Sequence, residues 1–164
     1  HIDNIDEGLK LYDYFFEVGG EFNVKPGAPN HPERIEGGLL SYGNDMDLND
    51  NPYECGFDKY INLESDIMFL GKESLKKIKE KGISRKLMGV KINTTSIEVY
   101  SKLPLYSSKN NLIGDLRSGA YSPQFDKVVG IAMINKDFCT VGQQFNVKYN
   151  EKFIKGEICN LPIK

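Results

Sequence analysis

The sequence predicts an α+β protein in which a helix and strand segment is followed by an antiparallel β-barrel or β-sandwich. Two observations lead to this class. Helical patterns are concentrated before residue 83, and after it six short runs rich in β-branched and aromatic residues alternate with turn signals. The 164 residues suffice for one domain, or for a small domain with a segment of a larger one. We therefore divide the chain into residues 1–83 and 84–164, with no linker long enough to let the halves move freely.

The opening segment, DNIDEGLKLYDYFFEVGG, predicts a helix that ends at its two glycines. Asp3 or Asn4 can cap its first turn, which is acidic. One helical stripe carries four apolar side chains: Ile5, Leu9, Tyr12 and Phe16. The pattern therefore predicts a helix with one face committed to a core.

Five further segments are expected before residue 83. EFNVKPGAPN is short and extended, and HPERIEGGLLSY predicts a second helix with Asn30 as its cap and Pro32 in its first turn. Residues 45–52, DMDLNDNP, are polar and predict an exposed loop. YECGFDKYINL then predicts a strand, and FLGKESLKKIKEKG a helix that stops at Gly82.

The second half predicts six strands, in RKLMGVKI, IEVYSKLPLY, LIGDL, VVGIAMI, QQFNVKY and KFIKGEI. The segment SGAYSPQFDK is expected to be a turn between two of them. Phe145, Val147 and Tyr149 alternate with polar residues, and Asn150-Glu151 separates them from the last run. This arrangement predicts a β-hairpin.

Composition excludes several classes of function. A formal charge of −2 without a clustered basic face argues against nucleic acid as the main partner, and the lysine-rich run from Lys72 to Lys81 is interleaved with glutamates, as on a solvated helix face. No run of about 18 apolar residues predicts a membrane span, and no targeting segment opens the chain. We expect a cytoplasmic protein. Because the chain starts at His1 and runs at once into a helix, we also expect it to be the C-terminal part of a longer polypeptide.

The usual catalytic residues are scarce. Only His1 and His31 provide imidazoles, and the three cysteines lie at wide spacing with no C-x-x-C pair. No phosphate-binding or dinucleotide-binding glycine motif occurs. The sequence therefore predicts no metal site, no disulfide framework and no histidine-based catalytic pair.

Arginine is rare enough to be informative, because Arg34, Arg85 and Arg117 stand against eighteen lysines. The planar guanidinium grips carboxylates with two parallel bonds, which lysine cannot do. Arg34 and Glu36 either tie their segment to neighbouring elements or contact a ligand. Arg117, in DLRSGAYSP, is either a surface residue of a barrel loop or a binding group. Eighteen tyrosines and phenylalanines suit a packed core or a pocket for flat rings and cations.

Five ordered motifs resemble the folate-binding family of the glycine-cleavage T-protein, the aminomethyltransferases. They are RIEGGLLSYGNDMD, NPYECGFDKYINL, FLGKESLKKIKEKG, RKLMGVKI and GDLRSGAYSPQFDKVVGIAMI. The family carries R-L-E-A-x-x-x-L-Y-G-x-D, N-P-x-E, F-I-G-K-E-A-L, R-K-L-V-G and T-S-G-x-F-S-P in the same order. The resemblance spans nearly the whole chain.

Within that family, GAPNHPERIEGGLLSYGND looks closest to the branch that demethylates dimethylsulfoniopropionate with tetrahydrofolate. T-proteins proper have G-A-R-D before R-L-E, whereas Asn30 stands here at the place of that arginine. The difference disfavours aminomethyl transfer in glycine cleavage, which remains an alternative. A non-catalytic barrel module of a larger assembly is a second alternative. The K-G-C-Y-x-G-Q motif of the related iron-sulfur repair proteins is absent.

The resemblance implies a three-domain ring with tetrahydrofolate at its centre and a C-terminal barrel. It places the catalytic residues upstream of His1, so the chain would supply one wall of the ring, would be inactive alone, and would need the N-terminal region of the same polypeptide. We expect Arg34 and Glu36 to lock that wall, Tyr42 and Asn44 to shape the turn beside it, and Tyr53 to anchor the next segment. The folate or substrate contacts implied by the resemblance are Asn30, Arg34, Glu36, Tyr42, Asn44, Tyr53 and Arg117. An apolar surface left exposed predicts self-association, with a homodimer as one form of it.

Overall fold

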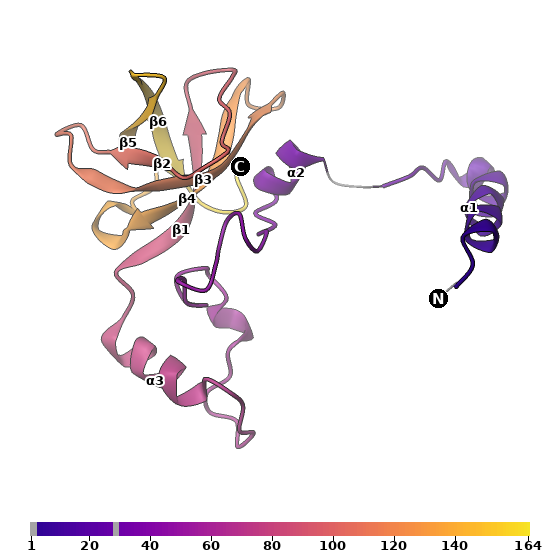
Figure 1. Ribbon diagram of the computed structural model, residues 1–164, viewed down its shortest axis with the longest axis horizontal. Helices are drawn as coiled ribbons and strands as arrows, with labels where there is room; N and C mark the ends of the chain where they lie inside the picture. The colour runs from indigo at the N-terminus through magenta and orange to yellow at the C-terminus, as the bar shows by residue number, and fades with distance from the viewer. Residues whose placement is uncertain (1–2, 28–29) are drawn as a thin grey trace.

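A ring of six antiparallel strands is the centre of the computed structural model, which describes residues 3–27 and 30–164 (Figure 1). The strands follow each other around the closed barrel in the order β1-β4-β3-β2-β5-β6. Their bounds are β1 Arg85–Ile92, β2 Leu103–Tyr106, β3 Leu112–Ser122, β4 Lys127–Asn135, β5 Gln144–Tyr149 and β6 Lys152–Cys159. The α+β class is confirmed, and the second half is a barrel rather than a sandwich.

Two apolar clusters pack against the barrel wall, one on each side. The inner cluster draws on all six strands, with Phe145 and Leu105 fully buried in it. The outer cluster covers β1 and β4, where Leu87 and Ile131 meet Ile35 from outside the barrel. Because side chains alternate along a strand, burial of both faces requires an apolar residue at nearly every position. This explains the continuous apolar run VVGIAMI in β4.

The hairpin expected between the last two strands is confirmed. β5 pairs with β6 from Gln144 to Tyr149, and the two residues between the strands have positive φ, 46° at Asn150 and 61° at Glu151. A two-residue turn of this kind matches the right-handed twist of the strands that it joins. The apolar residues at every second position, Phe145, Val147 and Tyr149, therefore match the side-chain alternation of a paired strand.

The three predicted helices are present: α1 Ile5–Gly19, α2 His31–Glu36 and α3 Lys72–Lys81, with single 3-10 turns η1 Gly20–Phe22, η2 Asp58–Tyr60 and η3 Lys136–Phe138. Asn4 caps α1 by accepting bonds from the backbone of Asp6 and Glu7. Asn30 caps α2 in a reciprocal capping box with Glu33. Gly82 ends α3 with φ +77°. Within the described residues, no helix is long and apolar enough to cross a bilayer.

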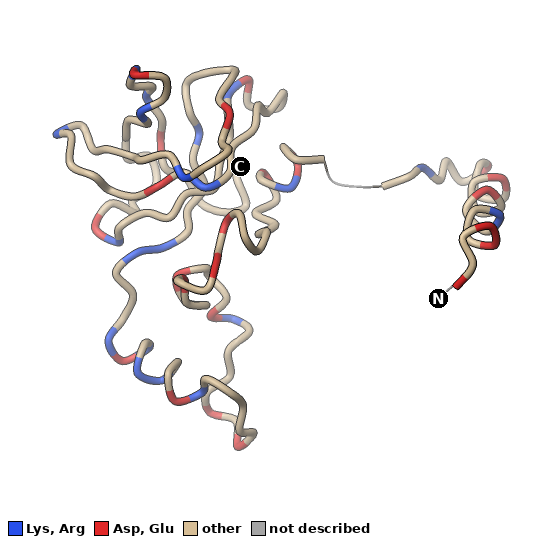
Figure 2. The backbone as a smooth tube through the Cα atoms, viewed as in Figure 1, with Lys and Arg blue, Asp and Glu red and all other residues tan. Residues whose placement is uncertain are grey.

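The helices differ in what they contact. α2 lies on β3 and β4, and its Ile35 is fully buried in the outer cluster. The prediction that one face of α1 packs in a core is wrong for the described residues, because its apolar stripe is exposed, with Ile5 82% and Leu9 58% accessible. Figure 1 shows α1 apart from the barrel and α3 projecting from the barrel on a separate arm. Figure 2 shows lysines and glutamates alternating along α3, as expected for a solvated face, although Lys72 itself is buried.

Three sequence expectations are corrected. The strand predicted in YECGFDKYINL is wrong, since residues 53–62 form turns and η2, with Gly56 at φ +75°. IEVYSKLPLY forms a strand only over its last four residues, β2. The turn expected in SGAYSPQFDK is confined to residues 123–126, because β3 continues to Ser122 by pairing with the apolar run of β4.

Candidate functional site

All three arginines of the chain converge on one segment, residues 39–54, which we call the strap. The strap runs from the end of α2 along the outside of the barrel, and it carries three buried carboxylates, Asp45, Asp50 and Glu54. We call the three arginines and these three carboxylates the arginine clamp. The scarcity of arginine in the sequence predicted that the planar guanidiniums bind carboxylates. In the structure, each of the three arginines forms an ion pair with a carboxylate.

Arg34 ties α2 to the start of the strap and to the barrel. Its Nη1 donates to Asp45 Oδ2 at 2.6 Å and to the backbone oxygen of Leu39 at 2.7 Å, and its Nη2 donates to Ser118 Oγ at 3.1 Å. The Asp45 carboxylate is fully buried and also accepts from the backbone of Ser41 at 2.7 Å and from Ser118 Oγ at 2.5 Å. A buried carboxylate with this many donors has its charge compensated on every side.

Arg117 joins the middle of the strap to β3. Its Nη1 and Nη2 donate to the two oxygens of Asp50 at 2.6 and 3.1 Å, and Nη1 also donates to the backbone oxygen of Asp45. Its Nε donates to Asp115 at 2.9 Å. Of the two alternatives for Arg117, a surface residue of a barrel loop is wrong, because Arg117 is buried in β3, at the irregularity in pairing between Leu116 and Ser118. The extra residue of such a bulge turns the side chain toward the strap.

Arg85, the first residue of β1, closes the end of the strap. Its Nε and Nη2 donate to the two oxygens of Glu54 at 3.0 and 3.2 Å, and Nη2 also donates to the backbone oxygen of Asn49 at 2.7 Å. The same Nη2 lies 3.0 Å from Asp50 Oδ1. Asp50 is therefore shared by two arginines.

The electrostatics of the clamp stabilise the charged forms. Burial raises the pKa of Asp50, but the hydrogen bonds from Arg117 and the backbone of Asp47 outweigh it and leave the pKa below its ordinary value. Burial likewise disfavours the charge of Arg117, and its bonds to Asp50 and Asp115 reverse this and raise its pKa.

The chemistry available in the clamp is structural. Every buried side-chain nitrogen and oxygen in the described part of the chain has a hydrogen-bond partner. No group of three His, Cys, Asp or Glu side chains within residues 3–27 and 30–164 is placed to hold a metal ion. The bonds of the clamp hold the strap to α2 and to the barrel. His1, one of the two imidazoles noted in the sequence, lies outside the described residues.

The other candidate residues lie around the clamp. The Asn30 side chain caps α2, accepting from the backbone of Glu33 at 3.0 Å, and the backbone oxygen of Glu36 accepts from Ile163 at 2.8 Å. Asn44 donates to Ser41 Oγ at 3.3 Å within the turn. Tyr42 is 65% exposed, and Tyr53 is half-buried, with its backbone nitrogen donating to Asn51 Oδ1. Of the seven candidates, Arg34 and Arg117 are brought together through Asp45.

Sequence reasoning missed the carboxylates, Arg85 and Ser118. Residues 45–52 were expected to be an exposed loop, but the side chains of Asp45 and Asp50 are 0% and 1% accessible. The signal that could have found them is the pairing of scarce arginines with a run of acids in a turn-rich segment. Four of the five family-like motifs meet here, through Arg34 and Asp45, Glu54, Arg85 and Ser118.

A cleft of about 530 Å³ lies beside the strap. Its walls are residues 37–40 at the end of α2, residues 55–60 after the strap, and residues 160–162 near the end of the described chain. The start of β1 forms its floor, with Leu87 and Met88 buried. This cleft borders the start of the strap through Leu39 and Leu40, and a second cleft of about 310 Å³ is lined by Arg85 of the clamp.

Comparisons with known proteins agree with this architecture. Residues 85–163 match the model of the glycine cleavage T-protein C-terminal barrel domain. The chain is 32% identical over 148 residues to dimethylsulfoniopropionate demethylase DmdA of Ruegeria pomeroyi, covering 90% of this chain and 40% of that protein. It is 30% identical over 161 residues to an aminomethyltransferase of Halothermothrix orenii, covering 96% of this chain and 44% of the relative.

A solved structure has the same fold. The crystal structure of glycine cleavage system aminomethyltransferase T from Bartonella henselae superposes with a TM-score of 0.73 at 25% identity, over 80% of this chain and 37% of that one. The chain thus spans about two-fifths of the length of the relatives that it matches. The chain belongs to the glycine cleavage T-protein family, whose C-terminal barrel domain is formed here by residues 85–163.

Proposed function

We propose that the chain is the C-terminal portion of a tetrahydrofolate-dependent methyltransferase that demethylates dimethylsulfoniopropionate, giving methylmercaptopropionate and 5-methyltetrahydrofolate. The observation that carries this proposal is the similarity to the Ruegeria pomeroyi demethylase over 90% of the chain. Asn30, at the place of the arginine that T-proteins have in G-A-R-D, supports the same choice.

The residues of this chain suit a supporting wall better than direct contacts to a folate. The guanidiniums of Arg34 and Arg117 are occupied by carboxylates and backbone oxygens, and the Asn30 side chain is occupied by the cap of α2. Two tyrosines of the strap are accessible, since Tyr42 is largely exposed and Tyr53 is half-buried. When bound, tetrahydrofolate would supply the amine nitrogen that accepts the methyl group.

The work of this chain would be positioning. A sulfonium methyl group leaves behind a neutral thioether, so its transfer depends on orientation more than on acid or base catalysis. The clamp fixes the strap to the barrel with charged bonds at its start, middle and end. A wall held in this way keeps its shape while the reactants are oriented.

We further propose that the N-terminal region of the same polypeptide packs on this chain and provides the catalytic residues. The exposed apolar stripe of α1 supports this, as does the run from Ile67 to Leu70, in which Leu70 is fully exposed. Surfaces of this size and character are normally covered in a folded protein.

Aminomethyl transfer in glycine cleavage is the second candidate, favoured by the Halothermothrix orenii relative and the Bartonella henselae structure. A non-catalytic barrel module is the third. The test is to measure methyl transfer from dimethylsulfoniopropionate to tetrahydrofolate, with this chain alone and with the chain preceded by an N-terminal region. Methyl transfer only by the longer protein supports the first candidate. Aminomethyl transfer from a lipoyl carrier instead supports the second, and no activity of either kind supports the third.

A further inference from the structure

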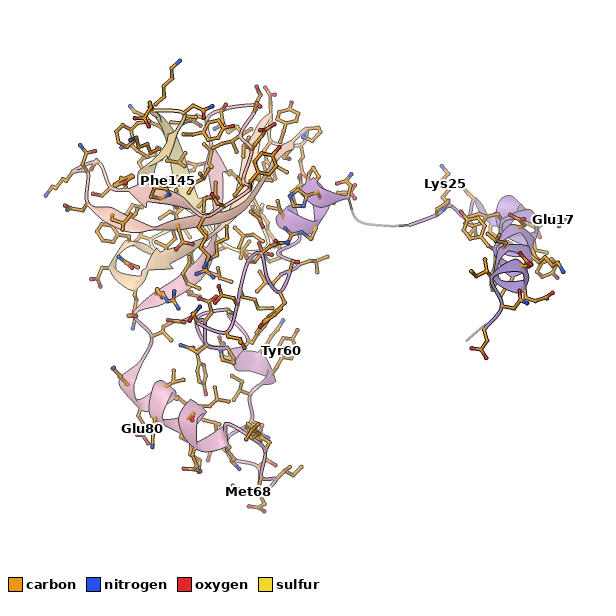
Figure 3. The ribbon with its side chains drawn as sticks, viewed as in Figure 1. Glu17, Lys25, Tyr60, Met68, Glu80 and Phe145 are labelled. Atoms are coloured by element: carbon orange, nitrogen blue, oxygen red, sulfur yellow. The ribbon has the colours of Figure 1, made fainter. Side chains whose placement is uncertain are left out.

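The loop that precedes α3, residues 62–71, carries apolar side chains that are exposed to solvent. Ile67 and Met68 are each 73% exposed, and Leu70 is fully exposed. None of these three belongs to either apolar cluster of the described residues. Figure 1 shows α3 projecting from the barrel, and Figure 3 labels Met68 at the end of that projection. The loop therefore presents apolar side chains away from the core of this chain.

Lys72, the first residue of α3, holds the loop from inside. Its side chain is buried, which is rare for lysine, and its Nζ donates to the backbone oxygens of Ser65 and Ile67. The centre of the Phe69 ring lies 6.0 Å from the same ammonium. Burial of an ammonium is costly unless it is hydrogen-bonded. The shape of the loop and the burial of this charge therefore depend on each other.

Short-range bonds shape the rest of the loop. Asn62 Oδ1 accepts from the backbone nitrogens of Glu64 and Ser65, and Ser65 Oγ accepts from the backbone nitrogen of Ile67. Gly71, with φ +91°, then leads into α3. The backbone conformation of the loop is thus determined within this chain. An apolar surface with a preformed backbone suits binding, because little conformational freedom is lost when a partner covers it.

The size of the loop decides what can cover it. A stable interface between separate proteins takes about 20 to 30 residues from each partner, whereas this loop offers the four apolar residues 67–70. A region of the same polypeptide is present at an effective concentration on the order of millimolar, so a small apolar contact is enough to hold it. The chain spans about two-fifths of the length of the relatives that it matches. A further region of the same polypeptide is therefore the occupant that the loop fits.

We propose that residues 67–70 dock into an apolar pocket of the N-terminal region of the same polypeptide, and that Lys72 is the positioning residue that gives this loop its docking shape. The docking rests on the proposed presence of that region, but not on which group the enzyme transfers.

Oxidation of Met68 by hydrogen peroxide reports whether the loop is covered. Of the four methionines of the chain, Met68 is exposed, Met46 is half-buried, and Met88 and Met133 are buried. Mass spectrometry should find Met68 oxidised first in this chain alone, and about tenfold more slowly when the chain is preceded by its N-terminal region. Equal rates in the two proteins would overturn the proposal. Slower oxidation that appears only at high protein concentration would also overturn it, because a second copy would then be the occupant.

Two matched variants of the longer polypeptide test the role of Lys72. Lys72→Leu removes the buried ammonium and keeps an apolar side chain, and Lys77→Leu makes the same change at an exposed position of α3. Oxidation of Met68 should return toward the rate of this chain alone in Lys72→Leu and should stay slow in Lys77→Leu. Met88 and Met133 should stay protected in both variants. Slow oxidation of Met68 in both variants, or rapid oxidation of Met88 and Met133 in Lys72→Leu, would contradict the role of a positioning residue.

A change at the tip of the loop tests the docking without touching the buried charge. Because Leu70 is fully exposed in this chain, Leu70→Ser should leave the thermal unfolding of this chain alone unchanged. In the longer polypeptide the same change should lower the midpoint of thermal unfolding, because it removes an apolar side chain from a filled pocket. Equal effects in the two proteins, or no effect in the longer one, would overturn the docking.

Methyl transfer, measured on the same samples, separates the docking from the proposed reaction. A longer polypeptide that protects Met68 but transfers no methyl group from dimethylsulfoniopropionate would refute the reaction and support the docking. Methyl transfer by a longer polypeptide in which Met68 is oxidised as fast as in this chain alone would support the reaction and refute the docking.

Discussion

Asp50 and Arg117, 67 residues apart in the chain, form a buried ion pair in which both oxygens of the carboxylate are bound by one guanidinium. Their side chains are 1% and 2% accessible. This pair joins the strap to the barrel wall. The free energy of unfolding that is lost when the pair is removed should therefore measure how strongly the fold depends on the clamp.

Asp50→Asn should lower the free energy of unfolding by about 3 kcal/mol at pH 7, because the buried guanidinium of Arg117 loses one of its two charged partners. Urea unfolding followed by circular dichroism measures this. Glu7→Gln is the control, since it removes an exposed i,i+3 pair with Lys10 and should cost less than about 0.5 kcal/mol. Equal losses in the two variants would contradict the role assigned to Asp50.

The same pair makes stability depend on pH at the acid end. The folded-state pKa of Asp50 is below its ordinary value of 3.8. The contribution of its carboxylate to the free energy of unfolding is therefore complete above pH 3.8 and is lost as the pH falls through the folded-state pKa. The free energy of unfolding, measured with urea between pH 2.5 and pH 7, should therefore fall more steeply toward acid pH in the parent than in Asp50→Asn. The difference in slope should correspond to about one proton, taken up by the carboxylate on unfolding. Parallel curves would count against this account.

Arg34→Ala should destabilise the protein by about 3 kcal/mol, because Asp45 is fully buried and would keep an uncompensated charge. Arg34→Lys should lose about 1 to 2 kcal/mol, since one ammonium cannot reach Leu39, Asp45 and Ser118 together. In the longer polypeptide proposed above, folate affinity would be measured alongside stability. If Arg34→Ala changed neither, both the structural and the ligand-binding roles would be abandoned.

Gly130 is needed for its lack of a side chain. A Cβ there would lie 2.6 Å from Leu116 Cδ1 and 2.6 Å from the backbone oxygen of Ser118, in the middle of the β3–β4 pairing. Gly130→Ala should therefore cost about 1 to 3 kcal/mol by overpacking. Gly20→Ala, in open space with φ −59°, should be neutral or stabilising by up to about 1 kcal/mol. Thermal unfolding of the two variants compares them directly.

The cysteines should differ in reactivity. Burial raises the pKa of Cys55 and of Cys159 to about 11, which keeps both thiols protonated at pH 8. Cys139 is also shifted upward by burial, but it is partly accessible. Mass spectrometry of iodoacetamide-treated protein should find Cys139 modified first, with Cys55 and Cys159 modified only after denaturation. Rapid modification of either buried thiol in the native state would disagree with the packing of the outer cluster.

The exposed stripe of α1 should make this chain self-associate. Leu9→Gln combined with Tyr12→Gln removes two of its apolar side chains, and Lys10→Gln is a control on the polar side of the same helix. Analytical ultracentrifugation should show concentration-dependent association for the parent and the control, and less for the double variant. A parent that sediments as a clean monomer at high concentration would refute this.

Much of the local structure could be predicted from the sequence, because interactions between residues close together in the chain determine it. The caps Asn4 and Asn30 and the terminating Gly82 act within a few residues of their own helices. All three helices were predicted, although α2 ends at Glu36 and does not continue to Tyr42. The β5–β6 hairpin was predicted for the same reason, since Asn150 and Glu151 adopt the turn that their position requires.

The expectations that failed depend on distant partners. Ser118 to Ser122 have the composition of a turn, but pairing with the apolar β4 holds them in β3. Cys55 and Phe57 suggest an alternating strand, yet both pack on the outer cluster around a left-handed Gly56. The rarity of arginine predicted carboxylate binding, but it did not identify the partners. Arg117 binds Asp50, which lies 67 residues away, and Arg34 also donates to Ser118, which lies 84 residues away. No pattern within a short window contains that information.

Closure of the barrel by its first and last strands has a consequence for synthesis. β1 hydrogen-bonds to β6, whose residues are made more than 60 residues later in the chain. On the ribosome, one edge of β1 therefore stays without its neighbour until the final strand has emerged. Folding dominated by such distant pairings is slow, and open strand edges are prone to misassociation in the interval. Nascent chains halted before residue 152 are thus the species on which molecular chaperones should act.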